Sequence, residues 1–301
     1  MKKSVSMLLA ALMLTGALAG CGSSASTSAS GTQAADGADS GVSGAITVIS
    51  REDGSGTRGA FIELTGVEEK TADGKKVDNT TADAEIANKT DVVLTSVAGN
   101  EKAIGYISLG ALNDTVKAVK VDGAEATVDN VKAGAYKLSR PFNIATKGEP
   151  TGVAKDFISF ILSKEGQAVV TDNKYIAVND AAESFVSDGS SGQIAVGGSS
   201  SVSPVMEKLI EAYKSVNPNA SIDLQTSDST SGMTGAMDGT FAIGMASREL
   251  KDEEAAQLTG IAIALDGIAV IVNPANTIDE LSMDQIKSIY IGDITDWGDL
   301  A

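Results

Sequence analysis

Residues 51–58, with the sequence REDGSGTR, place guanidinium, hydroxyl and carboxylate groups around two glycines, between the apolar runs 46–49 and 59–64. This order predicts a strand, a tight polar turn and the start of a helix. Gly54 and Gly56 allow close backbone approach, so successive amides at the helix N-terminus can point into one concavity that attracts an anion. An ordinary glycine-rich surface turn with a capping serine is the alternative interpretation.

The side chains of this turn suit a tetrahedral oxyanion. Arg51 offers a planar fork of donors, and the hydroxyls of Ser55 and Thr57 can donate further hydrogen bonds. Asp53 is the unusual member, because a carboxylate repels an anion unless that anion has a proton to donate. Phosphate carries such a proton near neutral pH and sulfate does not, so Asp53 is expected to accept a hydrogen bond from a protonated oxyanion.

Three later turns repeat the pattern of an expected strand followed by serines and glycines. They lie at residues 197–204, 227–232 and 244–248. Four strand ends of this kind favour a cleft that binds an oxyanion with neutral donors.

Short β-rich runs alternate with helical runs from Ala45 onward, which predicts an α/β architecture. Residues 66–81 look like an exposed loop, and residues 179–192 like a polar linker. The remaining expected elements are strands at 103–108, 116–121, 142–146, 194–196, 222–225 and 241–243, a helix at 153–162, and helices from Ser163, from a cap at Ser203 and from Met233.

The composition limits the chemistry. A formal charge of −17 over 301 residues argues against nucleic acid or anionic lipid as a partner. Anion binding must then rest on short-range hydrogen bonds and local dipoles. With no histidine and a single cysteine, the sequence excludes the usual zinc sites, a structural disulfide and histidine-dependent triads, and no cofactor or metal is expected.

The N-terminus has the order of a secretory signal, with two lysines, an apolar run over residues 8–14 and a small-residue segment ending at Cys21. The sole cysteine stands where the lipobox of bacterial lipoproteins places it. This predicts a signal peptide at 1–21 and a lipidated Cys21. Residues 22–44, rich in serine, alanine and glycine, predict a flexible tether. The folded part is then expected to work outside the cell, held at the cell membrane by the lipid alone.

The folded part resembles the phosphate-binding proteins of bacterial phosphate ABC transporters over nearly all of residues 45–301. The resemblance implies an α/β, two-lobed fold of the type II periplasmic binding proteins, with one dehydrated phosphate between the lobes. It also implies a membrane permease as partner and no enzymatic activity. The matching segments are REDGSGTR at 51–58, AIGYIS at 103–108, GSSSVSP at 198–204, LDGIAVIV at 265–272 and IGDITDW at 291–297.

The order of these segments departs from the family. Family members begin with the equivalent of residues 194–297 and continue with the equivalent of residues 46–178, whereas here the second part comes first. The chain therefore looks circularly permuted, with residues 179–192 joining the ancestral termini. A fragment of a tandem array is the alternative.

The permuted arrangement predicts how the chain divides into lobes. Residues 45–139 together with 270–301 would form the lobe that carries the phosphate loop. Residues 140–269 would form the second lobe without interruption. The hinge is expected where the chain crosses between them, near Arg140 and Gly267.

Taken position by position, the resemblance implies a defined set of phosphate contacts. Some family members carry an aspartate where this chain has Ser247, which leaves Asp53 as the expected sole carboxylate acceptor. Arg58 and Arg140 are interpreted as structural or rim charges. The implied contacts are Arg51, Asp53, Ser55, Gly56, Thr57, Ser200, Ser201, Ser229 and Ser247.

The sequence thus predicts an extracytoplasmic lipoprotein that captures inorganic phosphate as a monomer and delivers it to an ABC permease. A binding protein for another oxyanion, such as sulfate or molybdate, remains an alternative. So does a secreted phosphohydrolase, which would need a nucleophile with a base or a metal cluster. A surface sensor or adhesin with the same fold is a further alternative.

Overall fold

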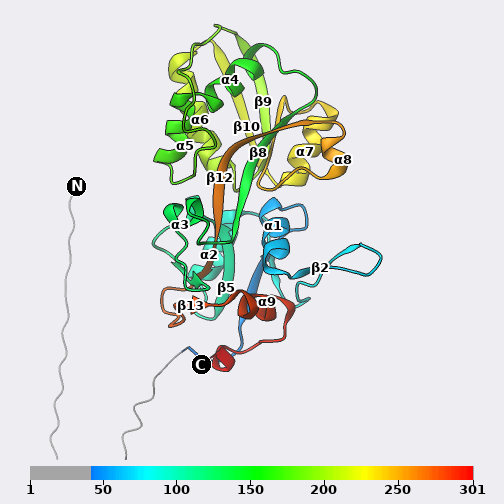
Figure 1. The fold of residues 1–301 in the computed structure, drawn as a ribbon, viewed down its shortest axis with the longest axis vertical. Helices are drawn as coiled ribbons and strands as arrows, with labels where there is room; N and C mark the ends of the chain where they lie inside the picture. The colour runs from blue at the N-terminus through cyan, green and yellow to red at the C-terminus, as the bar shows by residue number, and fades with distance from the viewer. Residues whose placement is uncertain (1–41, 301) are drawn as a thin grey trace, which may run out of the picture. The chain divides into compact units, whose positions relative to one another are not determined.

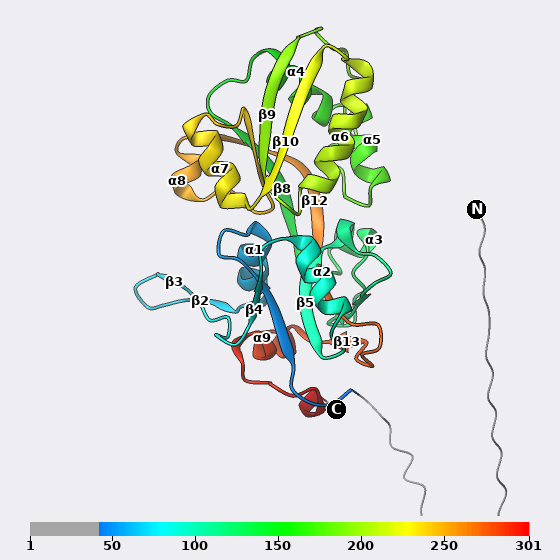
Figure 2. The same ribbon diagram turned by 180° about the vertical axis from the view of Figure 1, so that it is seen from behind.

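The computed structural model describes residues 42–300, which belong to one compact unit. The expected signal peptide, Cys21 and the tether up to residue 41 lie outside the described residues. Figures 1 and 2 show two lobes connected by two long strands, β8 (Ser139–Thr146) and β12 (Thr259–Val272). The expected two-lobed α/β fold is therefore confirmed for the part of the chain that is described.

The first lobe consists of residues 42–138 and 268–300, and the second lobe of residues 142–264. The first lobe contains β1 (Thr47–Arg51), α1 (Gly56–Thr65), β2 (Glu68–Lys70), β3 (Lys76–Asp78), β4 (Glu85–Ala87), α2 (Thr90–Ala98), β5 (Ala103–Ser108), η1 (Leu109–Ala111), β6 (Lys117–Ala118), β7 (Lys120–Val121), α3 (Val128–Lys132), β13 (Glu280–Leu281), α9 (Met283–Ile291) and η2 (Trp297–Leu300). The second contains α4 (Gly152–Leu162), α5 (Lys164–Asp172), β9 (Gly192–Ser199), α6 (Ser203–Val216), β10 (Ala220–Ser227), α7 (Ser229–Asp238), β11 (Ile243–Ala246) and α8 (Asp252–Ala255).

One mixed sheet runs through both lobes. Within the described residues it has nine strands, in the order β10-β9-β11-β8-β12-β5-β1-β4, with β6 beside β12. The first part of β12 pairs antiparallel with β8, and Ile268–Val272 then pair antiparallel with β5. The two lobes therefore share a continuous backbone connection at β8 and β12.

The hydrophobic core divides where these strands cross. One buried cluster extends from Val48 to Leu138 and includes the segment from Ile268 to Trp297. Another extends from Phe142 to Ala264. The lobe boundaries expected at residues 139/140 and 269/270 remain a prediction. The core divides close to them, although Ile268 and Ala269 belong to the first cluster.

Several local expectations need correction. Residues 66–81 are not a plain loop, because β2 and β3 pair as a hairpin within them. The expected strand at 116–121 is split into β6 and β7, which pair with different partners. Most of the turn expected at residues 227–232 is itself helical, since α7 begins at Ser229, before the expected start at Met233.

The segment 179–192 is not a loose linker. Buried Asp156 on α4 accepts hydrogen bonds from the Ser187 hydroxyl at 2.7 Å and from the Asp188 amide at 2.9 Å. The ring of Phe185 packs edge-on against Phe160. The second half of the segment is therefore held on the second lobe, whereas residues 179–181 are exposed.

Candidate oxyanion site between the lobes

The phosphate-loop sequence forms the strand, turn and helix that its pattern predicts. β1 ends at Arg51, and the Ser55 hydroxyl caps α1 by accepting a hydrogen bond from the Arg58 amide. The buried Tyr106 hydroxyl on β5 accepts a hydrogen bond from the Arg51 amide at 3.1 Å. The Tyr106 ring stacks on Phe61 of α1 with centroids 4.0 Å apart. β1 and α1 are thereby fixed relative to each other, and the turn between them has a defined position.

The Arg51 guanidinium is buried at the end of β1 and has partners on both sides of the cleft. Glu52 binds it bidentately, with its two carboxylate oxygens 2.8 Å from Nε and Nη2. Nη2 also donates to the Ser200 hydroxyl of the second lobe at 3.1 Å. Paired guanidinium and carboxylate groups of this kind are geometrically rigid, so Arg51 presents a positioned cation to the cleft.

A cluster of buried hydroxyls lies beside Arg51 and joins the lobes. The Thr57 Oγ1 atom lies 2.8 Å from Ser201 Oγ and 3.3 Å from Ser247 Oγ. Ser199 donates to Ser247 at 3.0 Å, and the Ser247 amide donates to the Ser229 hydroxyl at 3.1 Å. Donors that the sequence places in separate turns are thus brought together. We call Thr57, Thr90, Ser199, Ser200, Ser201, Ser229 and Ser247 the hydroxyl cluster.

Thr90 is a member of this cluster that sequence reasoning missed. Its hydroxyl lies 3.3 Å from Ser201 Oγ and 3.5 Å from Ser200 Oγ, and the residue is buried. Thr90 is the first residue of α2, which starts without a side-chain cap. The missing signal is therefore understandable, because neither a glycine turn nor a capping pattern marks this helix start.

The N-termini of helices from both lobes meet at the cluster. α1 and α2 begin beside it in the first lobe, and α6 and α7 begin beside it in the second. The first amides of a helix have no partners within the helix, and its N-terminus carries a partial positive charge. These ends favour an anion at the cluster although the chain as a whole has a net charge of −17.

Of the two roles that the sequence suggests for Arg140, structural or rim charge, its burial fits the structural one. It is buried where β8 and β12 pass between the lobes, and there Nη1 donates to the Asp266 carboxylate and Nη2 donates to Thr57 Oγ1 at 3.1 Å. Burial raises the pKa of Asp266, and the attraction of Arg140 offsets part of that rise. Arg58 also has structural contacts, since it bonds Asp78 and the Arg51 carbonyl.

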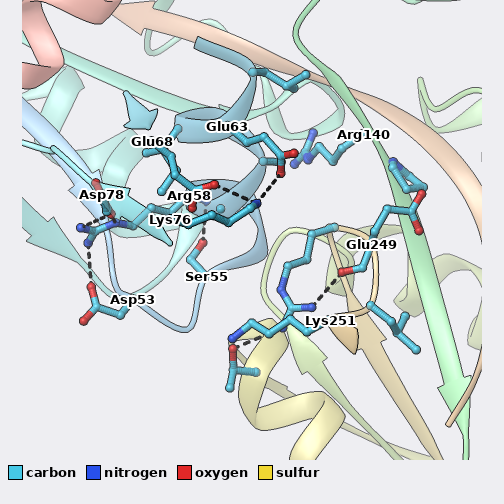
Figure 3. A pocket seen from close by; sticks show the side chains of 18 of the residues that line it. Asp53, Ser55, Arg58, Glu63, Glu68, Lys76, Asp78, Arg140, Glu249 and Lys251 are labelled. Carbon is cyan, nitrogen blue, oxygen red and sulfur yellow. Dashed lines mark hydrogen bonds and ion pairs between the residues drawn. The ribbon is translucent and has the colours of Figure 1, made fainter. Parts of the chain in front are cut away.

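Asp53 does not join the cluster. Its side chain is 97% exposed, and its carboxylate pairs with Arg58 at 3.0 Å. Figure 3 shows Asp53 and Arg58 pointing toward each other. The side chain therefore lies outside the buried hydroxyl cluster, although Asp53 lines the cavity between the lobes. Its expected role as the carboxylate acceptor stays a prediction.

A cavity of about 970 Å³ opens between the lobes next to the cluster. Ser55 of the phosphate loop, Arg140 of β8 and Glu249 of the second lobe all line it (Figure 3). At its edge the Gly54 carbonyl accepts hydrogen bonds from the Thr230 amide at 3.1 Å and from the Thr230 hydroxyl at 3.2 Å. The cavity thus reaches Arg140, which is bonded to Thr57 of the cluster, and direct contacts between the lobes border it.

Comparison with known proteins assigns this arrangement to a family. The chain matches the model of the PBP superfamily domain over residues 24–165 and 184–301. It is 49% identical to a Streptococcus agalactiae protein named phosphate-binding protein PstS 2, over 99% of this chain and 98% of the relative. The chain belongs to the family of PstS phosphate-binding proteins.

A solved PstS-family structure agrees with this assignment. It is the crystal structure of a phosphate-binding protein of a phosphate ABC transporter from Streptococcus pneumoniae TIGR4. The match has a TM-score of 0.69 and 50% identity, and it covers 86% of this chain and 100% of that one. The type II binding-protein fold expected from the resemblance is therefore confirmed.

Another relative matches only in part. The PstS of Bacillus subtilis is 34% identical over 137 residues, which is 45% of this chain and 42% of that protein. The S. agalactiae relative, by contrast, shares the order of segments along nearly its whole length. Circular permutation relative to other family members remains a prediction.

Two further observations concern the described residues alone. Among them, no helix is both long and apolar enough to cross a membrane. No group of three or more histidine, cysteine, aspartate or glutamate side chains within residues 42–300 could hold a metal ion.

Proposed function

We propose that this protein captures inorganic phosphate outside the cell and delivers it to the permease of a phosphate ABC transporter. The observation that carries the proposal is the convergence of Arg51, the hydroxyl cluster and helix N-termini at one buried point between two lobes. The names of relatives that align over nearly the whole chain supply the ligand and the transporter.

Binding replaces contacts between the lobes with contacts to the ligand. The hydroxyls of Thr57 and Ser201 are hydrogen-bonded directly to each other, so a phosphate can take its place between them only when the lobes part. The cavity beside Ser55 and Arg140 is the route by which we expect phosphate to arrive. After closure, the ligand receives donors from both lobes.

The proposed contacts are Arg51, Ser55, Gly56 and Thr57 of the first lobe, Ser200, Ser201, Ser229 and Ser247 of the second, and Thr90 in addition to those named from the sequence. Asp53 is left out as a direct contact. The donors are mostly neutral, which suits recognition at short range in a strongly acidic protein. A role as a binding protein also agrees with relatives named for binding and transport.

Calorimetric titration of the purified full-length protein with phosphate and with sulfate, at constant ionic strength, tests the proposal. Saturable binding of one phosphate per chain, with sulfate much weaker, is the expected result. Tighter binding of sulfate or molybdate would instead make the protein a carrier of another oxyanion. Turnover of a chromogenic phosphate ester would indicate a phosphohydrolase.

The proposal includes a lipid anchor at Cys21 and a monomeric state. The anchor is supported by the position of the sole cysteine at the end of the apolar signal run. It would keep the binding protein close to the permease without a membrane span. A single acyl chain gives only reversible membrane binding, so we expect the lipid on Cys21 to carry two or three acyl chains.

A further inference from the structure

Arg140 and Asp266 face each other across the two strands that connect the lobes. They are paired positions of β8 and β12, and both side chains are buried, with exposures of 3% and 0%. Arg140 Nη1 donates to the Asp266 carboxylate and to the Gly267 carbonyl, the latter at 2.7 Å. One end of the guanidinium is therefore fixed to the hinge.

The other end of the guanidinium reaches the oxyanion site. Its Nη2 atom lies 3.1 Å from Thr57 Oγ1, in the middle of the hydroxyl cluster. A hydroxyl has one proton to donate and lone pairs to accept with. Because an arginine can only donate, its bond occupies a lone pair of Thr57 and leaves the Thr57 proton for another acceptor.

Nothing else in the described part of the chain donates a charge-assisted hydrogen bond to this hydroxyl. The other neighbours of Thr57 Oγ1 are the hydroxyls of Ser201 and Ser247, each of which can donate or accept. A cluster made only of hydroxyls could point its protons in either direction. Arg140 removes that ambiguity at its central member, and Asp266 holds Arg140 where it can do so.

We propose that Arg140 is a positioning residue of the phosphate site, which Asp266 holds at the hinge so that the Thr57 hydroxyl is fixed as a donor toward bound phosphate. This inference rests on the proposed function. It also links the site to closure, because the two residues that orient Thr57 stand on the two strands that cross between the lobes.

The variant that tests this role most directly is Arg140→Lys. A lysine keeps the positive charge that buried Asp266 requires, but its single nitrogen cannot contact both Asp266 and Thr57 as the guanidinium fork does. We expect the ligand-free protein to fold and its affinity for inorganic phosphate to fall about tenfold, as for the loss of a charge-assisted hydrogen bond. Lys208→Arg is the control and should leave the affinity unchanged, because Lys208 makes only an exposed ion pair with Glu211.

A double-mutant cycle with Thr57→Val decides whether Arg140 acts through Thr57. If it does, Thr57→Val alone weakens binding and adding Arg140→Lys changes it little further, since the hydroxyl to be oriented is gone. Independent effects that multiply would overturn the inference, because Arg140 would then contact the ligand directly or merely stabilise the fold. An unchanged affinity in Arg140→Lys would overturn it as well.

The neutral pair Arg140→Gln with Asp266→Asn provides a second route that leaves no unpaired buried charge. The double substitution should weaken phosphate binding when Thr57 is present and have little effect when Thr57 is replaced by valine. Thermal unfolding of each ligand-free variant accompanies the titrations. If the wild-type protein fails to bind phosphate, the proposed function is overturned. If the wild type binds phosphate but the effects of the Arg140 and Thr57 substitutions multiply independently, only the role of Arg140 is overturned.

Discussion

The Thr57 Oγ1 atom lies 2.8 Å from the Oγ atom of Ser201, although the two residues are 144 positions apart in the chain. Thr57 belongs to the first turn of α1 in the first lobe, and Ser201 to the turn before α6 in the second. This hydrogen bond connects the two lobes directly. Phosphate affinity therefore measures how much better the ligand satisfies these hydroxyls than they satisfy each other.

Replacing Arg51 by alanine should weaken binding of every oxyanion. The guanidinium is buried, donates to Ser200 and neutralises Glu52, so its loss removes a charge-assisted donor and leaves a carboxylate near the site. A fall in phosphate affinity of about tenfold to a hundredfold is expected. Calorimetry with phosphate measures it, and Lys208→Ala, which removes only an exposed pair with Glu211, serves as the control. Unaltered affinity would exclude Arg51 from the site.

Asp53→Asn should leave the ratio of phosphate to sulfate affinity unchanged. The sequence alone predicts the opposite, since a carboxylate beside a dianion would reject sulfate. The carboxylate is 97% exposed and paired with Arg58, where solvent screens its charge. Parallel titrations of wild type and variant with both anions measure the ratio. A marked fall in the ratio would mean that Asp53 turns into the cleft when phosphate binds.

Ser247→Asp should raise the preference for phosphate over sulfate. Ser247 is fully buried in the hydroxyl cluster, 3.3 Å from Thr57 Oγ1, so a carboxylate there can accept the proton of phosphate. Sulfate has no proton to offer and would face an unpaired buried charge. The ratio should rise about tenfold or more. The same two titrations test it, with Ser247→Asn as the uncharged control of equal size; equal ratios in both variants would contradict the prediction.

Much of the fold could be predicted because its signals are local. β5 has the predicted bounds, Ala103–Ser108, since an apolar β-rich run between polar turns admits few other structures. The hydroxyl turns also carried their own signature of glycine and serine at strand ends. Thr90 and Arg140 could not be found in this way, because each enters the site through tertiary contacts of an otherwise ordinary segment.

The outward direction of the Asp53 side chain could not be predicted for a different reason. Its position in the turn was predicted, but the direction of its side chain depends on Arg58, with which it pairs across the start of α1. A sequence motif names the residues of a loop without fixing which of them face inward. The linker 179–192 shows the same limit, since its polar composition does not reveal that buried Asp156 holds it.

Rejoining the chain near residues 43 and 300 and reopening it elsewhere should preserve folding and binding. The Gly44 carbonyl accepts a hydrogen bond from the Trp297 amide at 3.1 Å, and Ala45 bridges to Asp296, so a short Gly/Ser linker can join these positions. The new break belongs at exposed residues 180–181 and not near Ser187, which Asp156 holds. Circular dichroism, thermal unfolding and phosphate titration compare the rearranged and natural chains.

A break between Ser187 and Asp188 is the matched comparison for that experiment. It cuts the segment held by Asp156 and should lower the melting temperature more than the break at residues 180–181. Loss of folding in the version opened at 180–181 would contradict the permutation reading, since an ancestral junction ought to tolerate separation.

Cys21→Ser should release the protein from the membrane. The position of this sole cysteine at the end of the apolar signal run predicts that it carries the lipid. Fractionation of cells that express the wild type or the variant, followed by immunoblotting, measures the distribution. Serine retains the size of the side chain but cannot form the thioether. Continued retention of the variant at the membrane would argue against a lipoprotein.

The placement of β12 late in the chain has a consequence for the order in which the lobes fold. β12 supplies the neighbour of β5, so the sheet of the first lobe is incomplete until residues 268–272 have emerged. Until then β5, whose residues are all buried in the finished protein, is an unpaired apolar edge. The second lobe is continuous in sequence and can fold first as a unit. Until β12 is available, the part of the first lobe that ends with β5 must therefore avoid self-association through this edge.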